Sequence, residues 1–179
     1  MRVVLQRVRE GSVEVEGKLV GQIGRGLVLL IGATIGDSEK EVVYLADKCA
    51  NLRIFEDAEG KMNLSLLDIG GEVLTISQFT LYGDTRKGRR PSFTQAMEPV
   101  QAEKLYQKFI GYLKEKGLKV EQGIFGAKML VEIFNDGPVT FVLDSKEKMS
   151  KIGRGSRNNG ISRSPTMPAP TKDDPEGSH

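Results

Sequence analysis

Apolar residues recur along the chain at two spacings, which separate the segments expected to form strands from those expected to form helices. Short apolar or alternating runs that end at glycine or other turn residues are typical of strands. Such runs cover residues 3–8, 12–16, 19–23, 26–33, 53–55, 73–82, 119–122, 129–134 and 139–143. The run at 26–33 is apolar throughout, which favours a central position in a sheet. A tight hairpin turn is expected at Glu16-Gly17.

Two other segments carry apolar residues at helical spacing. The first runs over about 39–52 and begins with Ser38 and Glu41, which form a capping-box pattern. The second begins at Glu98-Pro99 and ends at Gly117, where a helix commonly terminates. The apolar stripes are Val42, Leu45, Ala46, Cys49 and Leu52 in the first helix and Ala102, Leu105, Tyr106, Phe109 and Leu113 in the second.

The order of these elements predicts an α+β fold, in which mainly antiparallel β-sheets form a sandwich or partial barrel with two helices. This domain is expected to cover residues 1–145. Residues 146–179 are rich in Gly, Ser, Asn, Pro and basic residues, with almost no large apolar groups. A segment of this composition cannot bury a core, so a basic, disordered C-terminal tail is expected at 146–179.

The composition is that of a soluble globular protein, with 39% hydrophobic and 28% charged residues in a chain of 179. No apolar run approaches the length of a membrane span, and the first residues lack the apolar segment of a secretory signal. A cytoplasmic protein without a membrane partner is therefore expected. The formal net charge of +2 comes from the tail, because the body is close to neutral. Cys49, the single cysteine, lies on an apolar helix stripe, which predicts a buried, inert thiol.

Residues 73–82 combine a strand pattern with polar side chains. Ser77, Gln78 and Thr80 stand beside Phe79 in a segment whose two faces are otherwise mostly apolar. Unpaired polar groups in such a strand would cost free energy, so they need either hydrogen bonds within the core or a ligand. The pattern by itself favours hydrogen bonds within the core.

The following loop, residues 83–93, favours a ligand. It carries four cationic side chains, those of Arg86, Lys87, Arg89 and Arg90. A polar pocket beside a cationic loop suits an anionic ligand, with phosphate or nucleic acid first. The glycine spacing resembles a phosphate-binding loop, but Arg89-Arg90 follow where lysine and a hydroxyl residue are required, so that motif is rejected.

The single histidine, His179, is the last residue of the sequence. A Ser-His-Asp triad, a Cys-His pair and a histidine-rich zinc site are therefore excluded. Any chemistry must use hydroxyls, carboxylates, lysines, backbone groups or the substrate itself.

Several separate motifs resemble one known family. They are LQRV at 5–8, SVEVEG at 12–17, FEDAEGKMN at 55–63, SQFTL at 77–81, RPSF at 90–93 and NDGPVTF at 135–141. Together they resemble D-aminoacyl-tRNA deacylase over about residues 1–145. The resemblance implies a homodimer of a compact β-rich fold that hydrolyses the ester between a D-amino acid and the terminal ribose of tRNA, and also acts on mischarged glycyl-tRNA. It implies no metal and no cofactor.

The resemblance also implies roles for particular residues. Ser77, Gln78, Phe79 and Thr80 would form the catalytic pocket. Gly137-Pro138 would be a cis peptide that enters the partner subunit's pocket, with Met129 and Arg7 near this dipeptide. A rigid wall of this kind would exclude an L side chain by steric clash and still admit glycine. The basic loop with Arg86, Lys87, Arg89 and Arg90 would contact the acceptor end of tRNA.

The residues allow two interpretations of the mechanism. Thr80 could act as a nucleophile, but no histidine is present to activate it, so a residue of the pocket wall is the better interpretation. Attack by water, assisted by the ribose 2′-hydroxyl, is favoured, with backbone N–H groups near Phe79 and Thr80 holding the carbonyl oxygen. The alternative functions are an RNA-binding module without catalysis and an esterase that acts on small amino-acid esters.

Overall fold

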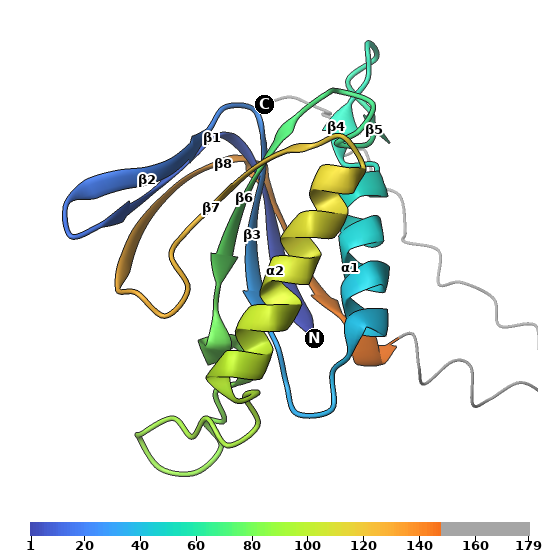
Figure 1. Ribbon diagram of the computed structural model, residues 1–179. Helices are drawn as coiled ribbons and strands as arrows, with labels where there is room; N and C mark the ends of the chain where they lie inside the picture. Colours follow the sequence, from blue (N-terminus) through green and yellow to red (C-terminus); the bar gives the residue numbers. More distant parts are fainter. Residues whose placement is uncertain (148–179) are drawn as a thin grey trace, which may run out of the picture.

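One mixed sheet forms the body of the protein in the computed structural model, which describes residues 1–147 (Figure 1). Its strands are β1 (Arg2–Val15), β2 (Lys18–Ile23), β3 (Gly26–Gly32), β6 (Glu72–Ser77), β7 (Lys119–Gln122) and β8 (Met129–Asp144). They lie in the order β2-β1-β3-β6-β7, and β8 pairs with β1. The pairs of β1 with β2, β3 and β8 are antiparallel, whereas β6 pairs in parallel with both β3 and β7.

Two helices, α1 (Glu39–Asn51) and α2 (Pro99–Glu115), lie side by side over one face of this sheet (Figure 1). The predicted capping box at the start of α1 is confirmed, because the Ser38 side chain caps the helix while Glu41 accepts from the Ser38 N–H. A small hairpin of β4 (Phe55–Glu56) and β5 (Met62–Leu64) stands at one end of the molecule. The α+β prediction with a curved, barrel-like sheet and two helices is confirmed.

The core has two parts, one on each face of the sheet. The larger part lies between the sheet and the helices, where Leu5, Leu29 and Phe109 are completely buried. The smaller part lies inside the curve of the sheet and includes Val28 and Leu74. Both faces of the central strands are therefore covered, as their apolar runs predicted.

Strand boundaries differ from the predictions in several places. The run at 53–55 is a strand only at its end, in β4, and no pattern predicted β5. The runs at 3–8 and 12–16 form one strand, β1, and the runs at 129–134 and 139–143 form one strand, β8. Irregular register between β1 and β8 near Val8 accommodates the residues that separate these runs. The Glu16-Gly17 turn is confirmed, because both residues have the positive φ angles, 52° and 73°, that such hairpins need.

The strand predicted over 73–82 is wrong beyond Ser77, where the chain enters the 3-10 helix η1 (Phe79–Tyr82). The reason lies in the neighbouring strands. The β3–β6 ladder ends at the pair Ile31–Ser77, and β3 itself ends at Gly32. The last bond to β3 is from Gln78 N–H to Ile31 O, so beyond Gln78 the chain has no β3 partner with which to continue as a strand. Ser77 and Gln78 are consequently half-buried and Thr80 is exposed, rather than enclosed in a sheet.

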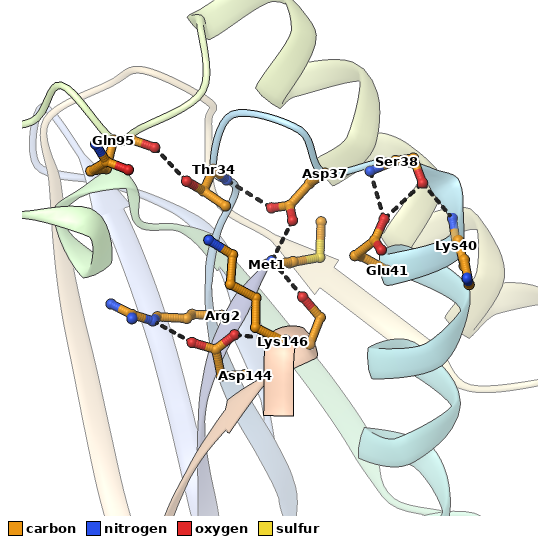
Figure 2. A network of polar contacts seen from close by, with 11 residues as sticks. Met1, Arg2, Thr34, Asp37, Ser38, Lys40, Glu41, Gln95, Asp144 and Lys146 are labelled. Atoms are coloured by element: carbon orange, nitrogen blue, oxygen red, sulfur yellow. Dashed lines mark hydrogen bonds and ion pairs between the residues drawn. The ribbon is translucent and has the colours of Figure 1, made fainter. Parts of the chain in front are cut away.

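The first and last described segments meet at one end of the sheet (Figure 1). The amino group of Met1 donates to Asp37 Oδ1 at 2.6 Å and to Ser145 Oγ at 2.7 Å, and the Met1 side chain is completely buried (Figure 2). Ser145 is itself buried, so the folded body extends at least to this residue. The predicted disordered tail falls almost entirely outside the described residues. No helix within residues 1–147 is long and apolar enough to cross a membrane.

Candidate functional site

A cavity of about 610 Å³ opens where β3 and β6 end. Its walls come from these strand ends, the start of α2, the segment 93–97 and the segment 125–131. Four of the predicted site residues line it, namely Ser77, Gln78, Phe79 and Met129. The rest of the lining is mostly apolar, so the polar groups are concentrated near the end of β6.

The turn from β6 into η1 places the polar groups. The Gln78 N–H donates to Ile31 O at 2.7 Å, which fixes the last residue before η1 against β3. The Gln78 Nε2 group donates to Thr80 Oγ1 at 2.5 Å. Phe79 and Thr80 open the helix, and the first N–H groups of any helix lack acceptors within it. Two backbone donors therefore stand at the end of β6, beside the cavity.

Thr75 shows what a polar group in the buried part of β6 requires. Its side chain is completely buried, and its Oγ1 lies 3.1 Å from the Tyr106 hydroxyl. The Tyr106 hydroxyl in turn donates to Thr75 O at 2.8 Å. Burial raises the pKa of Tyr106 to about 12, so this hydroxyl stays protonated at neutral pH. Hydrogen bonding within the core thus explains Thr75, whereas Ser77 and Gln78 face a cavity.

Several lining residues were not identified as site residues from the sequence. They include Met1, Met97, Tyr106 and Phe125. Tyr106 was predicted only as part of a buried helix stripe, and its ring lies 5.9 Å from that of Phe125. An apolar residue that lines a cavity has the same sequence pattern as one that fills a core, so the pattern gave no signal for this group.

The basic loop begins directly after η1 and reaches the mouth of the cavity through Phe93. Backbone hydrogen bonds in both directions between Asp84 and Ser92 close the loop. Phe93 packs edge to face against Phe79, with ring centroids 5.0 Å apart, and both rings are exposed. An exposed aromatic pair beside cations is a surface on which an unpaired base can stack.

The four cations of this loop are not equivalent. Arg86 forms a fork with Asp84, with Nε–Oδ1 at 2.9 Å and Nη2–Oδ2 at 2.7 Å. These bonds hold the pKa of Asp84 well below its ordinary value. Lys87, Arg89 and Arg90 are exposed. The net positive charge of the loop therefore resides mainly on these three residues.

Gly137-Pro138 lies in a different part of the fold. The peptide bond is cis, which confirms the predicted geometry, and both residues are exposed. Arg7, only 6% exposed, holds the segment because its Nε donates to Asp136 O at 3.1 Å. The Arg7 Nη1 group donates to Ile54 O at 2.7 Å, which ties the segment to the start of the β4–β5 hairpin.

Within one chain the dipeptide and the cavity are far apart. Asn135 pairs with Val8, whereas Met129 pairs with Val15. Seven positions along β1 correspond to about 23 Å of strand. Arg7 lies beside the dipeptide of its own chain, and its predicted role in substrate binding stays a prediction. Met129 instead lies at the cavity, so its proximity to a partner's dipeptide stays a prediction.

A metal site is not evident in the described part of the chain. No cluster of three or more His, Cys, Asp or Glu side chains suitable for a metal occurs within residues 1–147. Cys49 is buried in the core as predicted, and burial raises the pKa of its thiol to about 12.

Sequence comparisons relate the chain to a family of tRNA hydrolases. A family model described as D-Tyr-tRNA(Tyr) deacylase matches residues 4–144. The D-aminoacyl-tRNA deacylase of Brevibacillus brevis is 63% identical over 145 residues, which are 81% of this chain and 100% of that protein. The D-aminoacyl-tRNA deacylase of Thermosipho africanus is 58% identical over 147 residues, which are 82% of this chain and 99% of that protein.

Two solved structures resemble the fold. The c-Myc DNA Unwinding Element Binding Protein is 42% identical with a TM-score of 0.76, over 80% of this chain and 98% of that one. A probable eukaryotic D-amino acid tRNA deacylase has a TM-score of 0.70 over 79% of this chain and 97% of that one. Its 21% identity makes this second likeness one of fold alone.

Proposed function

The chain belongs to the D-Tyr-tRNA(Tyr) deacylase family, and from this premise we propose that its cavity at the end of β6 holds the ester of a D-aminoacyl-tRNA for hydrolysis. Its activity is that of a D-aminoacyl-tRNA deacylase, a hydrolase. The observation that carries the proposal for the site is the placement of Ser77, Gln78 and Phe79 in a cavity whose mouth adjoins a basic loop. The loop supplies Lys87, Arg89 and Arg90 for the phosphates of the acceptor end.

The reaction needs a site for the negative charge that develops on the carbonyl oxygen. In the proposed pose this oxygen accepts hydrogen bonds from the backbone N–H groups of Phe79 and Thr80. Water attacks the carbonyl carbon, and the ribose 2′-hydroxyl next to the ester assists by passing the proton of the water to the leaving 3′-oxygen. The carbon–oxygen bond of the ester then breaks, which releases the D-amino acid and free tRNA.

Thr80 is a positioning group in this scheme, not a nucleophile. Its Oγ1 accepts a hydrogen bond from the Gln78 amide, which cannot remove a proton from it. A nucleophilic hydroxyl needs an adjacent base, and the single histidine of the chain is His179.

Selection of the D enantiomer is assigned to a second subunit. In the proposed homodimer, Gly137-Pro138 of the partner subunit enters the cavity and occupies the space that an L side chain would need. Three observations support this: the dipeptide is exposed, Arg7 holds its segment, and it lies far from the cavity of its own chain. Because discrimination comes from a clash, glycine is accepted, and D-Tyr and D-Phe esters are cleaved at similar rates.

The test is a panel of four substrates under single-turnover conditions: D-tyrosyl-, D-phenylalanyl-, L-tyrosyl- and glycyl-tRNA. The D-aminoacyl and glycyl esters should be lost faster than in buffer, and the L ester should not. Equal rates for D- and L-tyrosyl-tRNA would refute steric rejection. Binding of tRNA without loss of any ester would favour the RNA-binding alternative. Faster cleavage of a free D-tyrosine ester than of the tRNA ester would favour the small-ester esterase.

A substitution at Gly137 directly tests whether the dipeptide occupies the space that an L side chain would need. In Gly137→Ala the new Cβ would lie 2.7 Å from Val139 Cγ2, at a φ of +125° that alanine rarely adopts. The segment must therefore shift, and the ratio of D to L hydrolysis should fall about tenfold or more. Gly60→Ala is the matched control, because Gly60 also has a positive φ, 76°, but no atom within 4 Å of the added Cβ. An unchanged ratio in a folded Gly137→Ala protein would contradict the proposal.

A further inference from the structure

Arg2 makes two contacts with the far end of η1 and one with the end of β8. Its Nη1 group donates to Leu81 O at 3.0 Å, and its Nε group donates to Asp144 Oδ2 at 2.8 Å. Its guanidinium carbon lies 4.8 Å from the centroid of the Tyr82 ring, a cation–π arrangement. Leu81 and Tyr82 are the last two residues of the same short helix that begins with Phe79 and Thr80.

This helix has few internal means of holding its orientation. It spans four residues, and a 3-10 turn of that length has poor hydrogen-bond geometry. The backbone bonds that join it to the flanking residues are Leu81 N–H to Gln78 O at 3.3 Å and Gly83 N–H to Thr80 O at 2.9 Å. The contact of Gln78 with β3 fixes the start of the turn, and the contacts of Arg2 fix its end.

The groups behind Arg2 are themselves firmly held. Asp144 ends β8, which pairs with β1 at Arg2, and its other oxygen accepts from the Lys146 N–H at 3.0 Å. The neighbouring Ser145 accepts from the Met1 amino group, which also pairs with Asp37 (Figure 2). Arg2 therefore transmits the position of the β1–β8 pair to η1, because its planar fork reaches both elements at once.

We propose that Arg2 is a positioning residue for ester hydrolysis: its fork between Asp144 and Leu81 O sets the orientation of η1 and hence of the Phe79 and Thr80 N–H groups that hold the carbonyl oxygen. The proposal rests on the proposed function of η1. Arg2 itself touches no reacting atom. Its contribution arises because a donor displaced by a fraction of an ångström no longer stabilises the transition state.

The experiment compares Arg2→Met and Arg2→Lys with wild type in single-turnover hydrolysis of D-tyrosyl-tRNA. Arg2→Met should lower the rate at saturating enzyme about tenfold, with half-saturation within about twofold, because geometry and not tRNA binding is changed. Arg2→Lys should recover part of the rate, since an ammonium group reaches only one of the two acceptors well. The matched control is Lys116→Met, which breaks an ion pair of 2.7 Å with Asp47 on the helices and should leave the rate unchanged.

A second readout does not depend on activity. Amide hydrogen exchange at Leu81 and Gly83, which report the bonds that join η1 to Gln78 and to Gly83, should be about tenfold faster in Arg2→Met than in wild type or Lys116→Met. If Arg2→Met does not fold, Asp144→Asn serves in its place, because it removes the charge that orients Arg2 and keeps the size of the side chain.

The outcomes separate this proposal from the proposed function. Unchanged exchange at Leu81 and Gly83, or unchanged rates with only a lower melting temperature, would overturn the role of Arg2. A loss of activity that comes only from a higher enzyme concentration at half-saturation would also overturn this role. A wild-type protein that fails to hydrolyse D-tyrosyl-tRNA would instead overturn the proposed function, and with it the catalytic meaning of Arg2.

Discussion

Thr80 illustrates how the neighbours of a residue decide between two chemical roles. Its hydroxyl follows the strand end that borders the cavity, which suits either a nucleophile or a residue of the pocket wall. The polar group that contacts it is the Gln78 amide, which donates a hydrogen bond and offers no basic atom to the hydroxyl proton. At the scale of single residues, this contact argues against a nucleophile. Thr80 is not among the residues that line the cavity, so its role in the pocket wall stays a proposal.

Thr80→Ala should retain substantial hydrolysis of D-tyrosyl-tRNA, within about tenfold of wild type, because the backbone donors of η1 are kept. The measurement is the single-turnover rate at saturating enzyme. Loss of essentially all activity, together with isolation of an aminoacyl-enzyme from wild type, would establish Thr80 as the nucleophile.

Cys49 gives a prediction about alkaline stability. Burial raises the pKa of the thiol from the ordinary 9.0 to about 12, since the thiolate is disfavoured in the core. The stabilisation from keeping this thiol protonated is fully present below pH 9 and is lost as pH rises toward 12. Between these values one such group reduces the free energy of unfolding by about 1.4 kcal/mol per pH unit.

Urea unfolding of wild type and Cys49→Ala between pH 8 and pH 11 checks this prediction. The variant should be less stable at pH 8, because a buried side chain is truncated, but its stability should decline less steeply above pH 9. Parallel pH profiles for the two proteins would show that Cys49 does not titrate in this range. Buried tyrosines also ionise at high pH, so some decline remains in both proteins.

At the scale of elements, an irregular point in β6 and another in β8 place the groups of the proposed site. β6 ends as its ladder with β3 ends, and the resulting turn presents backbone donors beside the cavity. β8 carries Gly137-Pro138 in its middle, where Arg7 ties the segment to the start of the β4–β5 hairpin. Arg7 thus holds together two elements that are distant in sequence.

Arg7→Lys should lower the ratio of D- to L-tyrosyl-tRNA hydrolysis about tenfold, because lysine cannot span Asp136 O and Ile54 O together. It should also lower stability by about 1–3 kcal/mol, the usual cost of leaving buried acceptors unpaired. Arg9→Lys is the matched control, since Arg9 pairs with Asp136 from an exposed position, 82% accessible. A similar loss of discrimination in both variants would argue against a special role for Arg7.

At the scale of the whole molecule, the apolar surface of β8 matters most. Leu130, Phe134 and Val142 are 63%, 54% and 65% exposed on a strand that carries the dipeptide. Several large apolar side chains exposed along one strand favour a surface that another protein covers. This surface fits the proposed homodimer, in which Gly137-Pro138 must reach the partner's cavity.

Sedimentation should therefore give twice the chain mass of 19.7 kDa. The double substitution Phe134→Lys and Val142→Lys should shift the protein to monomer and abolish discrimination together with activity. Leu19→Lys, at a residue of β2 that is 55% exposed, should remain dimeric and active. A monomeric wild type with full activity would refute the two-subunit site.

Truncation after Glu147, the last described residue, tests the expectation for the C-terminal tail. The family model matches residues 4–144, and the relatives align over 145 and 147 residues that make up almost their whole length, so we expect the catalytic domain to end near residue 145. The single-turnover rate at saturating enzyme should stay within about tenfold of the full chain, a change of about 1.4 kcal/mol. A larger drop would show that the tail takes part in the reaction. At higher salt, a higher enzyme concentration at half-saturation for the truncated protein than for the full chain would instead indicate that the basic tail adds affinity for tRNA.

The amino-acid sequence by itself determined both helices, most of the strand segments, the class of fold and the family. Spacing of apolar residues located both helices, their caps and the central strand, because amphipathic periodicity is a local property of each segment. The separate motifs at 77–81, 90–93 and 135–141 were enough to indicate a deacylase. The sequence also excluded catalysis that depends on an internal histidine, since that conclusion needs only composition.

Tertiary structure decided the rest, because contacts between distant residues leave no periodic trace. It ended β6 at Ser77 and placed Gly137-Pro138 far from the cavity of its own chain. It paired Arg86 of the basic loop with Asp84, and it brought Arg2, which no sequence pattern singled out, to the end of η1. A strand ends where its hydrogen-bonding partners on the neighbouring strands end. The role of an arginine depends on which acceptors its guanidinium group reaches. Both depend on how the whole chain packs.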